Sequence, residues 1–309
     1  MKAFFANTWK HRAHVIMSLP AFLILFFIMY VPMSGLVLAF KDYKPTDGLY
    51  GSAWCANPDG TLNILKNMKF LITSKDLFFG MTGNTLMYYV IFTALGTFLN
   101  VVLAIAIDQC IFKRCAKVMQ TIMIIPVFIS YAAVTFIVYA FLDRSTGIIN
   151  HLLGTQIAFY SEASKWPLIL TIVKMWNSVG YGSVLYMSVL AGIGTELYEA
   201  AEIDGANKWQ QIWHVTLPSL IPMITVMLLL SVGNVMKSDT GLFYQVTKNG
   251  AAIQQTTRVI DSYILTSLRS TPNYGFLAAA SLFQSVVGLI MMLLANGLVR
   301  RIEPDGALF

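Results

Sequence analysis

The chain has 309 residues, of which 57% are apolar and only 12% are charged, and its formal net charge is +6. Soluble domains contain roughly 45–50% apolar residues, so the composition excludes an ordinary soluble domain and predicts a protein that lies in a lipid bilayer. Three cysteines and four scattered histidines indicate neither a disulfide scaffold nor a metal site, and we expect no nucleic-acid partner.

Six runs without Asp, Glu, Lys or Arg exceed the roughly 18 residues that a helix needs to cross a bilayer. In chain order the runs are Val15–Phe40, Leu77–Ile107, Val118–Leu142, Met175–Thr195, Trp209–Met236 and Ser270–Val299. Long apolar runs without strand-like alternation favour helices over a barrel. The sequence therefore predicts an all-α integral membrane protein with six transmembrane helices.

The fourth helix is expected to begin near Trp166, which makes Lys174 the one charged residue inside a predicted span. No carboxylate lies in the six runs to pair with it. We therefore expect its amine to extend along the helix toward the outer interface.

The orientation follows from the charges that flank the spans. The first run shows no small-residue cleavage site and is predicted to stay as an anchor. Lys113, Arg114 and Lys117 lie in one short loop, and Arg300 and Arg301 follow the last run. Since basic residues favour the cytoplasmic side, both termini are predicted to be cytoplasmic.

Residues 41–76 are then extracytoplasmic. Leu62, Leu65, Met68 and the pair 70–71 recur near helical spacing, and the charges nearly balance. We expect this segment to be folded, and to pack on the helices or to meet a partner protein.

Residues 196–208, ELYEAAEIDGANK, contain four acids and one lysine between the fourth and fifth spans. An acidic cytoplasmic loop opposes the usual charge bias, which indicates a protein partner. Thr195 is expected to cap a short helix that Gly205 ends in the left-handed conformation. The alternative is a hairpin that is merely solvated at the interface.

The run EAAEIDGANKWQQIWHVTLP resembles the cytoplasmic loop of ABC importer permeases. The family's spacing is matched by Glu199, Ala200, Ala201, Gly205, Val215, Leu217 and Pro218, with valine replacing isoleucine at 215. The resemblance implies that this loop, in which Asp204 precedes the glycine, couples the chain to a separate ATP-hydrolysing subunit.

Other segments resemble the oligosaccharide and polysaccharide branch of carbohydrate-uptake permeases. They are GLVLAFKDY (35–43), QTIMIIPVFISYAAVTFIVYAFL (120–142), KSDTGLFYQV (237–246), VIDSYI (259–264) and YGFLAAASLFQSVVGLIMMLLANGLVRR (274–301). The chain departs from these relatives at Thr240, where they carry an aromatic residue, and at Tyr131, near which they carry tryptophan.

The resemblance implies a type I ABC importer permease that forms half of a sugar pathway in a bacterial cytoplasmic membrane. It also implies four kinds of partner: a second homologous permease, two ABC ATPase subunits, an extracytoplasmic solute-binding protein and a sugar, most simply an oligosaccharide. The sequence has no G-x-x-x-x-G-K-[ST] motif. ATP and Mg²⁺ are therefore expected on the ATPase subunits, and this chain is expected to be a non-catalytic subunit without a cofactor.

Three regions are predicted: residues 1–80, with the first span and the extracytoplasmic segment; a five-helix core, 81–301, that carries the coupling loop 195–218; and a cytoplasmic tail, 302–309.

Aromatic and polar residues within the spans are candidates for the pathway lining, because sugars need both stacking and hydrogen bonds. They are Trp176, Asn177, Tyr181, Asn234 and Gln284. The alternative is that these residues only pack or hydrogen-bond between helices.

Other functions fit less well. Residues 178–182, SVGYG, resemble a potassium-channel filter, but they lie within one apolar stretch rather than in a re-entrant loop. A proton-coupled sugar symporter would usually carry acids or histidines within its spans, and an intramembrane enzyme would need a catalytic constellation. The remaining alternative is an ABC permease for another polar solute, such as a polyol or glycerol phosphate.

Overall fold

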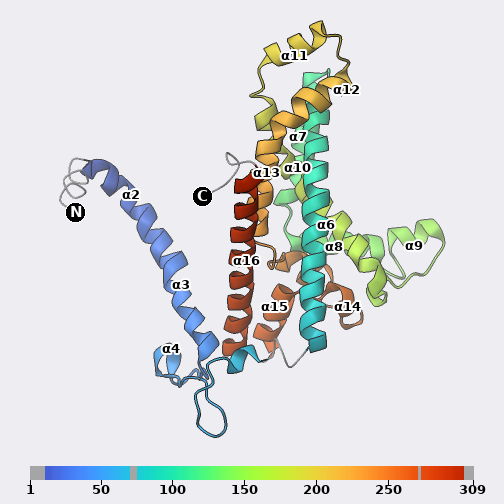
Figure 1. Ribbon diagram of the computed structural model, residues 1–309. Helices are drawn as coiled ribbons and strands as arrows, with labels where there is room; N and C mark the ends of the chain where they lie inside the picture. Colours follow the sequence, from blue (N-terminus) through green and yellow to red (C-terminus); the bar gives the residue numbers. More distant parts are fainter. Residues whose placement is uncertain (1–10, 70–74, 271–272, 303–309) are drawn as a thin grey trace. The chain divides into compact units, whose positions relative to one another are not determined.

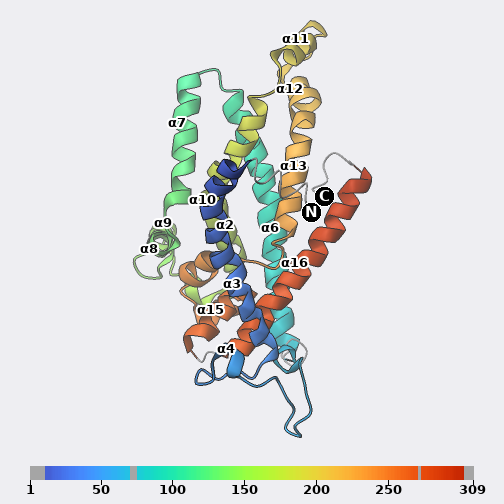
Figure 2. The same cartoon turned by 90° about the vertical axis from the view of Figure 1, so that its left-hand side faces the viewer.

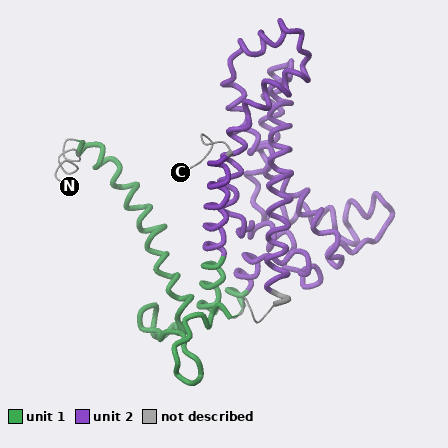
Figure 3. Tube along the Cα trace, in the orientation of Figure 1, with its two compact units in different colours: residues 1–73, 267–283 green, residues 74–266, 284–309 purple. Residues whose placement is uncertain are grey.

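A computed structural model describes residues 11–69, 75–270 and 273–302 of the chain. The chain forms two compact units, shown in Figure 3. The first comprises Met1–Thr73 and Ser267–Phe283, and the second comprises Ser74–Thr266 and Gln284–Phe309.

The first unit begins with one long helical segment, Arg12–Phe40, which is apolar enough to cross a membrane. It consists of α2 (Arg12–Leu25), the π-helical turn η1 (Phe26–Tyr30), α3 (Val31–Met33) and the 3-10 helix η2 (Ser34–Phe40). The side chains of this segment are exposed from residue 12 to residue 34, and Ala39 is its first buried residue.

Residues 41–69 are folded, as predicted, although the helical spacing of their apolar residues does not correspond to a long helix. They contain two short elements, α4 (Gly48–Gly51) and η3 (Lys66–Met68), and two isolated β-bridges. Leu62 lies in one of these bridges and Leu65 precedes η3, and both side chains are more than half exposed. The apolar spacing was therefore misleading, and residues 70–71 lie outside the described part of the chain.

Polar side chains hold this segment together instead. The buried Lys41 amine donates to the carbonyls of Leu49 (3.0 Å) and Tyr50 (2.9 Å). The Asn67 amide donates to the carbonyl of Lys41 (3.0 Å). The Tyr43 ring packs edge-on against Tyr274, with 5.3 Å between the ring centroids. The segment thus packs on the first turn of the last helix, which fits one of the two predicted locations.

The second unit is a helical bundle (Figures 1 and 2). Its long helices are α6 (Lys75–Asp108), α10 (Trp166–Leu190), α13 (Leu217–Val232) and the part of α16 (Tyr274–Ile302) from residue 284 onward. α10 packs along α6. One core cluster lies around Trp166, Leu170 and Phe243, and a second around Ala104, Tyr186 and Leu220.

The shorter elements of this unit connect the long helices. They are α9 (Ile148–Leu153), η5 (Phe159–Ser161), η6 (Ala163–Lys165), the π-helical η8 (Gly241–Val246), η9 (Ala251–Ile253), α14 (Gln254–Thr257) and the part of α15 (Ile260–Ser270) up to residue 266. Within the described residues the regular elements are all helical, apart from the isolated bridges. The predicted all-α fold is confirmed.

The third predicted span is not one straight helix. α7 (Lys113–Ile124) continues into the 3-10 helix η4 (Ile125–Phe128), and α8 (Tyr131–Leu142) follows at an angle of 101°. Pro126 cannot donate a backbone hydrogen bond, and the Ser130 hydroxyl caps a new helix by accepting from the Ala133 N–H at 3.3 Å. The described chain thus has five helices long enough to span a bilayer, or six if the bent pair is one span.

Residues 178–182 form part of α10, so their carbonyls are used within the helix rather than in an ion filter. The two glycines instead allow α10 to pack closely against α7 and α6. A Cβ at Gly180 would overlap the backbone carbonyl of Met123 on α7, and a Cβ at Gly182 would overlap the Asn100 side chain on α6.

Candidate functional site

The predicted coupling loop forms a helical hairpin that projects beyond the end of the bundle (Figures 1 and 2). We call residues 194–216 the α11 hairpin. It comprises α11 (Thr195–Ile203), α12 (Lys208–Gln211) and the π-helical η7 (Ile212–Thr216). α12, η7 and α13 form one unbroken helical segment, Lys208–Val232, so the second arm of the hairpin is continuous with a span.

The two ends of α11 differ in how well they were predicted. Gly194, with extended backbone, is the N-cap, and Thr195 is already helical, so the prediction that Thr195 caps the helix was wrong. Gly205 has a φ of +79°, as predicted. Its N–H donates to Glu202 O at 3.0 Å, and the Ala206 N–H donates to Ala201 O at 2.9 Å. This pattern is a Schellman motif, which a left-handed residue makes possible.

Local contacts fix the hairpin from within. Asn207 and Gln210 form a reciprocal capping box at the start of α12. The hydroxyls of Tyr198 on α11 and Thr216 on η7 lie 3.0 Å apart and share a hydrogen bond. The hairpin therefore has a defined shape of its own, and a hydrogen bond joins its two arms one residue before α13.

The surface of the hairpin combines acids, small residues and exposed apolar side chains, of which Ile203 is the most exposed. Glu199, Ala200, Asp204 and Gly205 are exposed. A hollow of about 430 Å³ lies between the two arms, lined by Leu197, Ala200, Ala201, Asp204, Gly205, Ala206, Gln210, His214 and Val215. Ile203 is 87% exposed at the end of α11. Sequence reasoning missed Ile203, although an isoleucine among acids in a polar loop was a signal.

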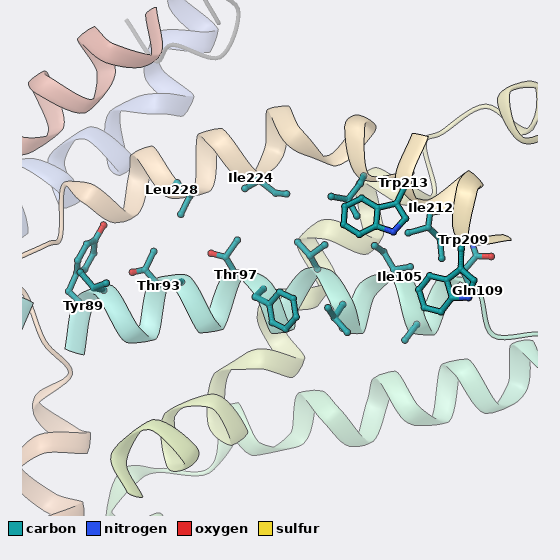
Figure 4. A pocket seen from close by; sticks show the side chains of 17 residues that line it. Tyr89, Thr93, Thr97, Ile105, Gln109, Trp209, Ile212, Trp213, Ile224 and Leu228 are labelled. Atoms are coloured by element: carbon teal, nitrogen blue, oxygen red, sulfur yellow. The ribbon is translucent and has the colours of Figure 1, made fainter. Parts of the chain in front are cut away.

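An apolar groove of about 890 Å³ runs between α6 and the α12–α13 segment (Figure 4). Trp209 and Trp213 lie near Gln109 at one end of the groove, and Tyr89 lies at the other end. The Tyr89 and Ser231 hydroxyls, 3.0 Å apart, connect the two walls there. Leu217 of the predicted loop lines this groove, whereas Pro218 occupies the first turn of α13 and is exposed.

The five candidate pathway residues do not form one cluster. Trp176 is 43% exposed and lines an apolar groove of about 500 Å³ with residues of α8 and α9. Tyr181 is 57% exposed on another face of α10. Consecutive helical residues point about 100° apart, and Asn177 is turned inward, where its amide donates to Pro126 O at 2.8 Å.

The other two candidates also bond to backbone. The buried Gln284 amide donates to Met236 O at 2.6 Å, and the Asn234 amide donates to Leu230 O at 3.3 Å. Such hydrogen bonds fit the alternative given above, in which these residues only pack or hydrogen-bond within and between helices. Tyr181 and Trp176 keep exposed aromatic surface.

Lys174 has a carboxylate partner outside the six apolar runs. Its amine forms an ion pair with Asp239, at 3.1 Å from Oδ2, and lies 3.5 Å from the Tyr131 hydroxyl. Asp239 lies just beyond the fifth apolar run, in the connection between α13 and η8. A search for partners within the runs could not have found it.

Comparisons with known proteins agree with this architecture. Residues 100–304 match the family described as binding-protein-dependent transport system inner membrane component. Protein LplB of Bacillus subtilis is 29% identical over 94% of this chain and 89% of its own length. The polygalacturonan/rhamnogalacturonan transport system permease protein YteP of the same organism is 28% identical over 94% of this chain and 88% of its own.

Among solved structures, a bacterial ABC transporter involved in the import of the acidic polysaccharide alginate contains a chain similar to this one. It superposes with a TM-score of 0.84 at 28% identity, over 97% of this chain and 99% of that chain. The match to the family extends over more than half of the sequence and includes the whole α11 hairpin. The chain belongs to the family of binding-protein-dependent transport system inner membrane components.

Proposed function

We propose that the chain is the permease subunit of an ATP-driven, binding-protein-dependent importer of oligosaccharides. The observation that carries this proposal is the α11 hairpin, a preformed projecting element with an uncovered apolar end, on a chain of this family. The names of the relatives support the substrate class. YteP is named for polygalacturonan and rhamnogalacturonan, and the solved transporter is described with a periplasmic protein that holds an alginate pentasaccharide.

The proposed assembly has this permease and a second, homologous one in the bilayer, two ATPase subunits, and a solute-binding protein. The hairpin faces the cytoplasm and docks on an ATPase subunit, with both chain termini on the same side. ATP and Mg²⁺ bind to the ATPase subunits. This chain is non-catalytic, and its role is to form half of the pathway and to transmit movement.

The geometry suggests how movement is transmitted. When ATP binding draws the ATPase subunits together, α11 moves with its ATPase. The Tyr198–Thr216 hydrogen bond and the unbroken segment Lys208–Val232 then carry the displacement into α13. A rigid-body movement of packed helices can alternate access to a central pathway.

Uptake in proteoliposomes tests the proposal. The assembled transporter should accumulate a labelled oligosaccharide only when ATP is enclosed and the loaded binding protein is on the other side. A proton ionophore should leave the initial rate unchanged. Accumulation that follows a proton gradient without ATP would instead identify a symporter.

A further inference from the structure

The charged cluster at Lys174 is built into the second unit and is not explained by coupling to an ATPase. Lys174 lies within α10, well inside the candidate span Ala163–Leu190. An ionisable residue at this depth is costly in hydrocarbon and usually marks a function. The Lys174 and Asp239 side chains remain 25% and 31% exposed. An ion pair that is open on one side must face water or polar protein rather than lipid.

Backbone N–H groups fix the position of the Asp239 carboxylate. Its Oδ1 accepts from the N–H groups of Gly241 (3.1 Å) and Leu242 (3.4 Å), and its Oδ2 accepts from Lys174. The Tyr131 ring lies so close to Gly241 that a Cβ there would meet it at 2.5 Å. The carboxylate is thus fixed at the start of η8, with Tyr131 beside it.

The lysine amines of this cluster keep hydrogen-bond donors that the described residues do not use. An ammonium group has three N–H bonds, and Asp239 and the Tyr131 hydroxyl account for two of them at most. Lys237, on the same connection, is exposed, and among the described residues its amine bonds to no other side chain. The second nearby carboxylate, that of Asp261, is turned toward the Ser238 N–H (2.6 Å) and hydroxyl (2.9 Å). A ligand rich in acceptors fits this pattern.

The same face of α10 is polar and aromatic. Ser178 and Tyr181 follow Lys174 by about one and two helical turns, so they lie on one stripe with it. Tyr181 is 57% exposed. The other exposed stripe, with Ile172 and Trp176, borders an apolar groove. Only the Lys174 stripe, among the described faces of α10, offers both a stacking ring and charged donors.

We propose that Lys174, together with Tyr181 two turns further along α10, binds a carboxylate of an anionic oligosaccharide, an oligouronide, as it passes through the permease. This inference rests on the proposed function and adds the substrate's charge and the residue that recognises it. A charge-assisted bond between an ammonium and a carboxylate is stronger than one to a hydroxyl. The Lys174–Asp239 pair keeps the lysine in place when no substrate is bound.

The test compares two probes that differ in charge, trigalacturonate and its methyl ester, in reconstituted transporter. The affinity of the binding protein for each probe is measured separately, since a permease substitution does not alter it. Lys174→Gln should lower the uptake of trigalacturonate about tenfold and change that of the ester by less than about twofold. Lys174→Arg should keep most of the trigalacturonate uptake. Lys165→Gln is the control, because it removes the cation of a surface pair with Glu162 (2.7 Å) at the start of the same helix.

A second measurement needs no neutral probe. In a chain with Cys55, Cys110 and Cys115 replaced, Lys174→Cys should react with a water-soluble, membrane-impermeant thiol reagent, and trigalacturonate with binding protein and ATP should slow the reaction. If the thiol reagent does not modify Lys174→Cys in the assembled transporter, position 174 lies outside the pathway and the inference is overturned. Equal loss of both probes in Lys174→Gln would do the same, by showing that the pair only supports the fold. Absence of any ATP-driven sugar uptake in the unmodified transporter would instead refute the proposed function.

Discussion

At the scale of single residues, Ile203 is the most informative side chain of the α11 hairpin. Isoleucine is among the residues most often buried, yet Ile203 is 87% exposed next to Glu202 and Asp204. Nothing in the described chain covers it. On a chain of this family, an isoleucine so exposed at the end of a projecting helix is the side chain that we expect a partner protein to cover.

Ile203→Asp should weaken binding of the ATPase subunit by about tenfold or more, on the order of 1.4 kcal/mol, because a charge replaces a desolvated anchor. Affinity of the purified ATPase for the reconstituted permease pair measures this. Leu152→Asp is the control, since Leu152 is 78% exposed on α9, away from the hairpin. If Ile203→Asp binds the ATPase subunit as tightly as Leu152→Asp does, Ile203 does not lie in the interface.

At the scale of elements, the contact of α10 with α7 depends on Gly180. Alanine in place of glycine usually stabilises a helix by roughly 0.5–1 kcal/mol. A Cβ at Gly180 would overlap the Met123 carbonyl, whereas a Cβ at Gly96 on α6 would make ordinary contact with the end of the Met175 side chain, 3.9 Å from its methyl carbon. The same substitution should therefore have opposite effects at the two sites.

Gly180→Ala should lower the melting temperature of the purified permease pair by several degrees, because overpacking costs about 1–3 kcal/mol. Gly96→Ala should leave it unchanged or raise it slightly. Thermal unfolding followed by intrinsic fluorescence in one detergent compares the two. A raised melting temperature in Gly180→Ala would show that α7 and α10 do not pack as closely as described.

The segment 41–69 depends on an ion pair between Asp42 and Lys66, 2.8 Å apart. The hydrogen bond from Lys66 holds the pKa of the Asp42 carboxyl below its usual value, and the same bond raises the pKa of Lys66. A lowered carboxylate pKa stabilises the fold above the unfolded value of about 3.9, and this contribution is lost as the pH falls through the folded pKa. The raised lysine pKa stabilises the fold below about 10.4 and is lost at higher pH.

Asp42→Asn should speed amide exchange at Cys55 and Asn63 at neutral pH, since their N–H groups bond across this segment. As the pH falls through the folded pKa of Asp42, the variant and the unmodified protein should converge. Asp47→Asn is the control, because among the described residues the Asp47 carboxylate accepts a side-chain hydrogen bond only from its neighbour Thr46, at 2.9 Å. Identical exchange in Asp42→Asn and the unmodified protein at neutral pH would count against this role.

At the scale of the whole molecule, hydropathy predicted most of the fold because a bilayer requires long apolar helices. It could not predict the 101° bend between α7–η4 and α8, since a continuous apolar run does not show where a helix changes direction. Pro126 followed by Ser130 was a local signal of that bend. Which face of α10 carries Trp176 or Asn177 depends on how α7 and α8 pack, and residue type alone does not determine this.

The coupling loop was more predictable than the pathway because its conformation is local. Gly205 and the capping residues act within a few positions of the sequence, and Gly205 adopts the predicted conformation. The Lys174–Asp239 pair joins residues 65 positions apart. Only the tertiary structure brings these two charges together.

Gly205→Val tests most directly the proposed coupling of ATP hydrolysis to import through the α11 hairpin. A β-branched residue at a φ of +79° is strained by on the order of 1–3 kcal/mol, although a Cβ there would meet no atom within 4 Å. Gly154→Val imposes a similar strain at a φ of +63° at the end of α9. Gly205→Asn should be tolerated, because asparagine adopts the left-handed conformation.

The measurement is the ATPase rate of the reconstituted transporter with and without loaded binding protein. We predict that the loaded binding protein stimulates the unmodified transporter, Gly205→Asn and Gly154→Val, and does not stimulate Gly205→Val, which should still contain a folded permease bundle. Normal stimulation together with normal uptake in Gly205→Val would contradict the account.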